Sequence, residues 1–530
     1  MSPTSYQLLY PAIYCSIESL IRLTHVSEKV KKKIRSAEKR RKKRAPAFLF
    51  KQLKKMDFAF DICYDNINKK ILIGFGRKKN TMTKDLTKGS ILKCILSFTI
   101  PILLGALFQQ VYNVVDTAIV GRYLGVNQLA GVGSAGAVFF LMVTPVMGLC
   151  NGFSIPVAQR FGAGEEREVR RYVANTAWLC IAIAAFLVIV TMALCRPLLR
   201  LVNTPEEAFG YAFRYLIVIF AGIPFTFLYN MTSGIMRSLG NSRTPVFFLI
   251  LSSILNVFLD LLFIIAFNMG TAGAAFATVL SQAASGIACF LSLRSYHVLK
   301  MQGDEKKADF PVMKELSRFG FPMMLNLFIT AIGAMFVQWA VNGFGTAVAA
   351  GVASGQKIHS VLGCPMDALG QTMASYTGQN TGARRMDRVR KGMVTALLLC
   401  AGWWILSNLI IRTGGNSLVG LFINLEEADA TASALRFVTV TVSANILYGA
   451  ILTLRSALLG LGYPGISVIC GIVEMIGRTF VAVYLSQRFG FAGLCYIHIA
   501  AWILAALLLL PGFILLLKRK TAELTVLPES

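Results

Sequence analysis

The sequence predicts an all-α membrane protein in which twelve transmembrane helices form two duplicated six-helix lobes. Hydrophobic residues make up 55% of the 530 residues and charged residues only 15%, which excludes an ordinary soluble protein. Apolar stretches of about 20 residues, long enough to cross a bilayer, recur from Ile91 to Leu517. The same short motifs also appear twice along the chain, at a constant spacing.

We count twelve apolar spans, six on each side of a polar segment near residue 300. They lie near 91–115, 131–153, 173–195, 211–235, 245–266, 272–293, 319–341, 348–372, 393–412, 431–454, 466–486 and 491–517. This pattern divides the chain into a basic N-terminal extension (1–88), a first lobe (89–300), an inter-lobe linker (301–317), a second lobe (318–520) and a short tail (521–530).

The two halves of the membrane region repeat each other about 220 residues apart. The recurring pairs are Pro145…Gln159…Gly162-Ala163 with Pro365…Gln379…Gly382-Ala383, Ala130-Gly131-Val132 with Ala350-Gly351-Val352, and Gly270…Gly273 with Gly490…Gly493. A constant offset over three separated stretches indicates tandem duplication of a six-helix block. Duplicated blocks of this kind are typical of transporters, whose substrate site lies where the repeats meet.

The Lys and Arg residues of the short loops favour a cytoplasmic position for both termini. With the N-terminus inside, the inside loops hold 21 of these residues and the outside loops hold seven. We therefore expect a multi-pass protein of the cytoplasmic membrane.

The N-terminal extension differs from the rest of the chain in its charge. Residues 1–89 hold 22 Lys and Arg against seven Asp and Glu, so +15 of the +27 net charge lies there. The run KVKKKIRSAEKRRKKR (29–44) suits anionic lipid headgroups, whereas nucleic acid is not expected because no base-reading module accompanies it. The favoured interpretation is that translation begins at Met82, which starts a polar lead into the first span. Otherwise we expect the extension to be largely disordered.

The sequence carries no signature of an enzyme or of a bound metal or cofactor. Its eleven cysteines are scattered without a CxxC pair, and its four histidines form no HExxH motif. No Walker loop or GxSxG motif is present either. We expect a protein that is not an enzyme and has no cofactor.

Two carboxylates stand inside the apolar spans of the first repeat. Asp116 lies toward the end of the first span and Asp260 within the fifth, while the repeat offset lands on Phe336 and Phe480. We therefore expect the acid chemistry to be confined to the first repeat. An ionised carboxylate inside a bilayer costs several kcal/mol unless it faces a partner or a wet cavity.

Further oxygen-bearing side chains accompany the two acids. Tyr112 and Asn256 each lie four residues before an acid, hence on the same helix face, and Thr278 stands in the sixth span. Carboxylate, amide and hydroxyl oxygens suit Na⁺ or a proton rather than a transition metal. The plainer alternative is that Asp116 and Asp260 only hydrogen-bond neighbouring helices.

The second repeat has a different polar set. Glu474 and Arg478 are spaced i, i+4, which predicts an ion pair within one helix that holds the fold. We expect Lys357 to face the central cavity and to meet Glu474 across it. His498 occupies the place of Thr278 and is either titratable or simply hydrogen-bonded.

Residues 108–125 (FQQVYNVVDTAIVGRYLG), followed by VAQRFGAGE, resemble the multidrug and toxic compound extrusion (MATE) family. The resemblance runs from Lys88 to Lys520 and is closest to the DinF-like branch. Other stretches that carry it are IMRSLGNSRTPV, NVFLDLLF, MGTAGAAFATVLSQ and, in the second repeat, TGQNTGARR. The sequence departs from other branches in the seventh and tenth spans, which carry residues such as Gln338 and Asn445 but no acid, so a second cation site there is not expected.

The resemblance implies two lobes around a central V-shaped cavity and a secondary antiporter that exports small organic, often cationic and amphiphilic compounds in exchange for Na⁺ or H⁺. The coupling ion would be held by Asp116, Asn256, Asp260 and Thr278. The candidate cavity residues are Tyr112, Gln109, Gln282, Gln338 and Lys357. The expected partners are the organic substrate and membrane lipid, and the monomer is expected to function. An alternative is a flippase for a lipid-linked saccharide, which needs a cationic central groove for which Lys357 and Arg478 are the candidates.

Overall fold

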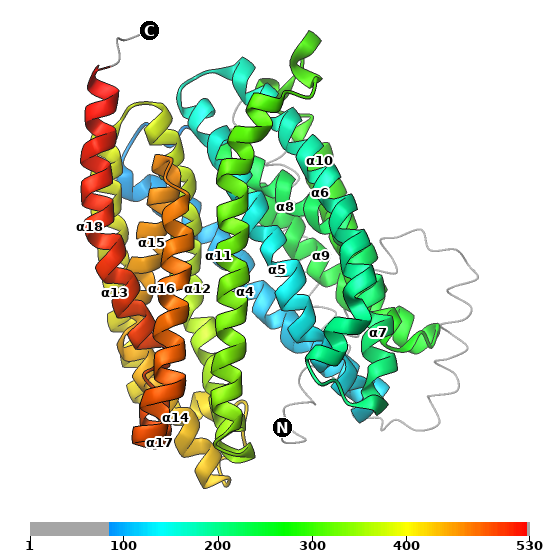
Figure 1. The fold of residues 1–530 in the computed structure, drawn as a ribbon. Helices are drawn as coiled ribbons and strands as arrows, with labels where there is room; N and C mark the ends of the chain where they lie inside the picture. The colour runs from blue at the N-terminus through cyan, green and yellow to red at the C-terminus, as the bar shows by residue number, and fades with distance from the viewer. Residues whose placement is uncertain (1–83, 527–530) are drawn as a thin grey trace, which may run out of the picture. The chain divides into compact units, whose positions relative to one another are not determined.

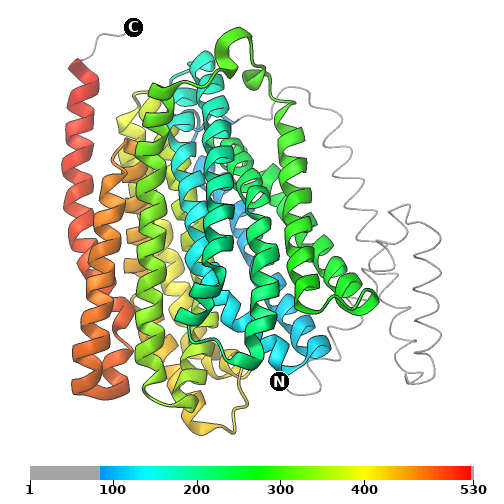
Figure 2. The same cartoon turned by 45° about the vertical axis from the view of Figure 1, so that its right-hand side comes forward.

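All regular elements within residues 84–526, the part of the chain that the computed structural model describes, are helices (Figures 1 and 2). The all-α prediction is therefore confirmed for this part. The expectations for residues 1–83 lie outside the described residues.

The helices of the first lobe follow the predicted spans in order. They are α4 (Ile91–Leu124), α5 (Val126–Gly162), α6 (Glu166–Leu201), α7 (Glu206–Ala221), α8 (Ile223–Ser238), α9 (Arg243–Leu261), the π-helical η1 (Leu262–Ala266) and α10 (Gly270–Leu293). Two short 3₁₀ helices, η2 (His297–Leu299) and η3 (Gly303–Lys306), occupy the linker. This connection between α10 and α11, residues 294–309, begins and ends earlier than the predicted linker (301–317). Helix α10 ends at Leu293, and Asp309 accepts a hydrogen bond from the Val312 N–H at 3.4 Å where α11 begins.

The second lobe repeats this order. Its helices are α11 (Phe310–Asn342), α12 (Thr346–Gly382), α13 (Met386–Val419), α14 (Ala428–Ser443), α15 (Asn445–Leu461), α16 (Gly465–Phe480), the π-helical η4 (Val481–Leu485), α17 (Ser486–Leu494) and α18 (Ile497–Val526). We call the end of the helices where the Lys- and Arg-rich loops lie (160–171, 294–318 and 384–391) the basic end.

Eleven of the twelve predicted spans are apolar enough to cross a membrane. Nine helices of the described part qualify singly, and the pairs α7–α8 and α14–α15, bent by 48° and 50°, qualify together. The twelfth, α12, is 37 residues long but less apolar, and most of its C-terminal half is buried. A helix that is largely covered by other helices does not need an apolar surface.

The bends in the fourth and tenth spans have local causes. Pro224 stands in the first turn of α8, where a proline lacks the N–H that would continue α7. At the second bend, Trp404 Nε1 donates to the Ser443 carbonyl at 2.7 Å, and Asn408 Nδ2 donates to the Val442 carbonyl at 3.2 Å. These donors satisfy carbonyls that the bend frees, as an apolar environment requires.

The duplication is visible in the backbone itself. Gly125 and Gly345 have φ of +87° and +91° between the first two helices of each lobe. Gly270 and Gly490 both have φ of +59°, and each follows a π-helical segment. Both lobes therefore use the same glycine conformations at corresponding places, 220 residues apart.

The lobes meet at the basic end through a reciprocal contact of α5 and α12. A Cβ on Gly162 would lie 2.0 Å from the carbonyl oxygen of Gln379, and a Cβ on Gly382 would lie 1.8 Å from that of Gln159. The two glutamines also reach across the lobes: Gln159 Nε2 donates to the Gly460 carbonyl at 2.8 Å, and Gln379 Nε2 donates to the Ser238 carbonyl at 2.7 Å. We call this contact the lobe seam.

The opposite ends of the same two helices pack within their own lobes. Gly131 of α5 lies against Ala208 and Tyr211 of α7, and Gly351 of α12 lies against Ala430 of α14. The contacts between α5 and α12 are thus concentrated at the basic end.

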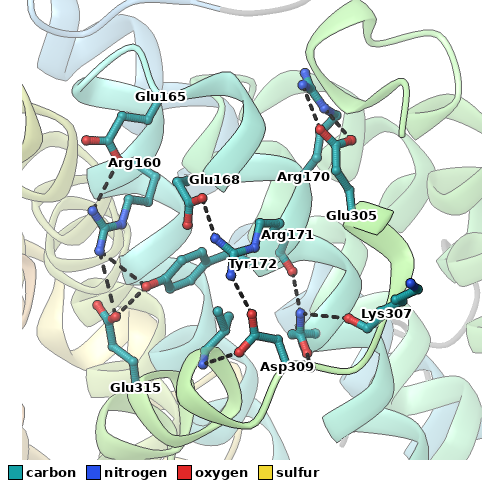
Figure 3. A network of polar contacts seen from close by, with 12 residues as sticks. Arg160, Glu165, Glu168, Arg170, Arg171, Tyr172, Glu305, Lys307, Asp309 and Glu315 are labelled. Atoms are coloured by element: carbon teal, nitrogen blue, oxygen red, sulfur yellow. Dashed lines mark hydrogen bonds and ion pairs between the residues drawn. The ribbon is translucent and has the colours of Figure 1, made fainter. Parts of the chain in front are cut away.

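The linker is held to the first lobe by ion pairs with α6 (Figure 3). Arg170 binds Glu305 through two hydrogen bonds, from Nε at 2.7 Å and from Nη2 at 2.9 Å. Arg171 binds both Asp309 and Glu168, and Trp178 Nε1 donates to the Lys306 carbonyl at 3.0 Å. A bidentate Arg–carboxylate pair fixes orientation as well as distance, so the linker has a defined path along α6.

Tyr172 and Arg160 continue this network to α11. The Tyr172 hydroxyl donates to Glu315, and Arg160 lies 3.7 Å from the same carboxylate and 3.1 Å from Glu165 (Figure 3). The first lobe is thereby linked to the start of the second at the basic end.

Replacing Gly162 with alanine should destabilise the protein, because the added methyl group would overlap the Gln379 carbonyl. We expect a cost of about 1–3 kcal/mol, the usual range for overpacking, seen as a lower melting temperature. The control is Gly136→Ala in the same helix, where a Cβ meets no atom within 4 Å. That change should be neutral or slightly stabilising, and equal melting temperatures for the two variants would contradict the seam.

Replacing Glu305 with glutamine should loosen the linker. Its hydrogen bonds with Arg170 lower the pKa of the Glu305 carboxyl, so the pair contributes stability above the unfolded pKa of about 4.3 and loses it as pH falls through the folded value. Trypsin at neutral pH should cut Glu305→Gln after Lys300, Lys306 or Lys307 several times faster than the unchanged chain. Asp304→Asn, which removes a highly exposed ion pair with Lys307, should leave the cleavage rate unchanged.

Candidate functional site

The structure brings Asp116 of α4 and Asp260 of α9 together. The two carboxyl groups are hydrogen-bonding neighbours, and the Oδ1 atom of each is buried without a partner. Asp260 is fully buried, and neither acid forms an ion pair with a basic side chain of residues 84–526. Two carboxylates in contact repel each other unless a proton or a metal cation lies between them.

Asn256 and Thr278 complete the predicted set. With the Asn256 amide oriented so that both of its polar atoms are satisfied, its Nδ2 donates to Asp260 Oδ2 at 2.9 Å and its Oδ1 accepts from the Thr278 N–H at 3.0 Å. The Thr278 hydroxyl donates to the Ala274 carbonyl at 3.1 Å. The amide thus bridges α9 and α10 and directs a donor at the carboxyl pair.

Two tyrosines lie near the carboxyl pair. The Tyr112 hydroxyl is a hydrogen-bonding neighbour of Thr278, and Tyr215 of α7 lies within electrostatic reach of both acids. Tyr215 was not predicted, because α7 shows no periodic polar signal that points toward α4 and α9. The rest of the surroundings is an apolar cluster that includes Ile119, Val120 and Ile264.

The local sequence explains this convergence. The i, i+4 spacing of Tyr112 with Asp116, and of Asn256 with Asp260, places each pair on one helix face. Gly105 permits close packing of α4 on α9, since a Cβ there would lie 3.2 Å from Val246. The π-helical η1 begins two residues after Asp260, and such segments often occur at functional sites.

The remaining candidate cavity residues each have their own local surroundings. Gln109 is exposed on α4, Gln338 donates to Asn342 at 2.8 Å, and Gln282 accepts from Thr226 at 2.7 Å. The Lys357 ammonium lies 5.8 Å from the ring centre of Phe422. Their role in substrate binding, like the V-shaped cavity, stays a prediction.

The second lobe neutralises its buried acid. Glu474 lies 3.2 Å from Arg478, which confirms the intrahelical pair, and 3.5 Å from Arg455 of α15, which the sequence did not suggest. The prediction that Lys357 meets Glu474 is wrong, because both oxygens of Glu474 face arginines. Arg478 is thus paired and Lys357 lies over an aromatic ring, so these two candidate cations do not favour the alternative of a saccharide flippase.

Asp367 of α12 corrects the expectation that acids are confined to the first repeat. Its Oδ1 accepts a hydrogen bond from the Tyr448 hydroxyl at 2.7 Å. His498, left open by the sequence, stacks on Trp502 and His359, with ring centres 5.7 Å and 6.3 Å away. Asp367 lies two residues after Pro365 and has no second acid at helical spacing within its span. The search for paired acids in the sequence therefore did not find it.

Comparison with known proteins identifies the fold and the family. A family model described as MatE matches residues 101–262 and 322–485, one stretch in each lobe. The chain belongs to the MatE family. MatE proteins are transporters rather than enzymes, and several relatives of this chain are named multidrug efflux proteins, so the chain is a multi-pass membrane transporter of this family. Membership in the DinF-like branch stays a prediction.

Individual MatE relatives are similar to this chain over most of its length. A probable multidrug resistance protein, YpnP, of Bacillus subtilis strain 168 is 30% identical over 356 residues, which are 66% of this chain and 78% of that protein. The multidrug export protein MepA of Staphylococcus saprophyticus is 21% identical over 452 residues, or 83% of this chain and 98% of MepA. A solved outward-facing structure of a multidrug resistance MATE transporter has a TM-score of 0.76 at 22% identity and covers 84% of this chain and 99% of that one, which shows the fold.

Replacing Glu474 with glutamine should destabilise this MatE protein strongly. Arg455 and Arg478 would keep their charges in a buried setting without a carboxylate, and breaking such a set costs about 3–5 kcal/mol. Lys357→Gln, which changes a side chain in the same lobe without an ion pair among the described residues, should melt like the unchanged protein. A small effect of Glu474→Gln on the melting temperature would show that the arginines have other partners.

Proposed function

We propose that this chain is a secondary antiporter of the cytoplasmic membrane, which exports small organic, often cationic and amphiphilic compounds in exchange for H⁺ or Na⁺. The observation that carries the proposal is the contact of Asp116 with Asp260 inside an apolar cluster, without a basic partner in the described part of the chain. A site of this kind gains stability when a cation enters and loses it when the cation leaves.

The direct contact of the two carboxyls favours a proton as the coupling ion. A shared proton forms a hydrogen bond between the two groups, whereas Na⁺ would have to lie between their oxygens and hold them apart. The buried Oδ1 atoms of the two acids would supply oxygen ligands for either ion, while Asn256 Nδ2 donates to Asp260 Oδ2. The gradient experiment below therefore distinguishes between the two ions.

Helix α4 offers a physical route from the ion site to the lobe seam. Asp116 lies in its second half, while Thr99 in its first half donates to the Thr372 hydroxyl of α12 at 2.8 Å. The segment just before α4 is also bound to the second lobe, since the Leu86 N–H donates to Gln379 Oε1 at 2.9 Å. Cation entry at Asp116 would thus act on a helix that contacts both lobes.

Export requires that the inward-open and outward-open arrangements of the lobes bind substrate and ion with different affinities. A ligand that binds both arrangements equally well does not change the equilibrium between them. We place the basic end in the cytoplasm, on the 21-to-seven distribution of Lys and Arg. Opening of the seam would admit substrate from the cytoplasm or inner leaflet, and its closure would expose the site to the other side. The names of the relatives support an organic substrate, and one chain with two lobes supports a functional monomer.

Purified protein in proteoliposomes, loaded with a fluorescent organic cation, provides the test. A proton gradient and a Na⁺ gradient are imposed separately, and the gradient that drives efflux identifies the ion. Asp260→Asn and Asp116→Asn should each slow driven efflux at least tenfold, since a cation no longer finds two carboxyls. The matched control is Asp367→Asn, which changes an acid of the second lobe. Efflux that ignores both gradients, or equal losses in all three variants, would overturn the proposal.

A further inference from the structure

A hollow of about 890 Å³ lies between α13 and α18 at the basic end. Both helices pack on α15, whose Leu454 lines the hollow. In both views of the fold, α18 is the outermost helix of the second lobe (Figures 1 and 2). The hollow is therefore a groove on the outer side of this lobe, away from the carboxyl pair.

The two walls are single helix faces. On α13 the lining residues Met386, Arg390, Met393, Val394 and Leu397 recur every three or four positions. On α18 they are Leu510, Phe513, Ile514, Leu517, Lys518 and Thr521. Each wall is apolar over most of its length and becomes charged toward the basic end.

The apolar part has the depth of most of one membrane leaflet. Arg390 and Leu397 are separated by about 10 Å of helix, and Lys518 and Leu510 by about 12 Å, at 1.5 Å per residue. The hydrocarbon core of one leaflet is about 15 Å thick. Basic side chains at the mouth of the groove would thus stand at headgroup level while its walls follow the acyl chains.

The charge at the mouth is positive and not neutralised. Asp387, the acid of the lining, lies 3.3 Å from Arg385, which is outside the groove. Arg390 and Lys518 form no ion pair with an acid of residues 84–526. An anion bound between them would be attracted from both walls.

We propose that an anionic phospholipid of the cytoplasmic leaflet occupies this groove, with its phosphate between Arg390 and Lys518 and its acyl chains along Val394, Leu397 and Leu510. The inference uses the membrane orientation proposed above but does not depend on which ion or substrate the protein carries. It goes beyond a general lipid coat, because it requires a negative headgroup at one place.

The groove is placed to influence the lobe seam. Arg388, in the same first turns of α13, donates to the Gly89 carbonyl at 2.9 Å and to the Leu86 carbonyl at 3.3 Å. These contacts hold the segment that leads into α4. A lipid that fixes α13 against α18 supports this anchor, and so favours the arrangement in which the basic end is closed.

The test is the melting temperature of the full chain in detergent, with dioleoyl phosphatidylglycerol or dioleoyl phosphatidylcholine added at equal concentration. The anionic lipid should raise it by several degrees and the zwitterionic lipid by much less. In Arg390→Gln/Lys518→Gln this difference should disappear. The matched control Lys391→Gln/Lys93→Gln removes the same charge from exposed positions that do not line the groove, and should keep the difference.

A second variant tests whether the apolar wall of the groove is needed in addition to the positive charge. Val394→Trp fills the apolar wall without changing any charge, and should also abolish the response to phosphatidylglycerol. Native mass spectrometry should show one phosphatidylglycerol retained by the unchanged protein and by the charge control, and none by the two groove variants. Equal responses to both lipids, an undiminished response in the groove variants, or the same shift with inorganic phosphate would overturn the proposal. None of these readouts requires transport, so they stand apart from the antiport assay.

Discussion

The reciprocal contact of Gly162 with Gln379, and of Gly382 with Gln159, is the constraint on which the rest of the structure depends. It brings two helix backbones closer than any side chain would allow, and each glutamine then binds a carbonyl at the end of a helix in the other lobe. Because both partners come from the same duplicated motif, each contact occurs twice and the lobes are joined symmetrically.

The two lobes share a backbone plan but balance their buried charges differently. In the second lobe, Glu474 lies between Arg455 and Arg478, so its charge is compensated whatever else is bound. In the first lobe, Asp116 and Asp260 face each other with an amide and tyrosines around them. Such a pair depends on an added cation, whereas a carboxylate between two guanidinium groups does not. The two halves thus share a scaffold, but only the pair in the first lobe lacks a basic partner in the described part of the chain.

Much of this arrangement was predictable from the sequence, and the remainder was not for physical reasons. Helix periodicity placed Tyr112 with Asp116 and Asn256 with Asp260, and the oxygen-bearing side chain of Thr278 in the sixth span added it to this set before the family resemblance did. Periodicity describes one helix at a time, so the contacts made by Tyr215, Arg455 and Tyr448 from other helices could not be found that way. The sequence also could not explain why α12 is less apolar than the other spans. Its burial by neighbouring helices is not visible in a hydropathy pattern. The bends at Gly222 and Ala444 were not predicted either. At Ala444, the freed Ser443 carbonyl accepts a hydrogen bond from Trp404 of another helix, which no local pattern shows.

Helix α4 connects the carboxyl pair to the seam, because its two halves contact different lobes. Its first half is tied to the second lobe through Thr99 and, just before it, Leu86, while its second half carries Asp116 against α9 of the first lobe. Under the proposed function, a change of charge at Asp116 would alter how tightly the second half is held, and the helix would transmit that change to the half bound at the seam. Arg388 fixes the lead into α4 from the other side, beside a groove lined with basic and apolar side chains. Ion occupancy and membrane composition would therefore act on the same helix from its two ends, which is a sufficient physical basis for coupling them.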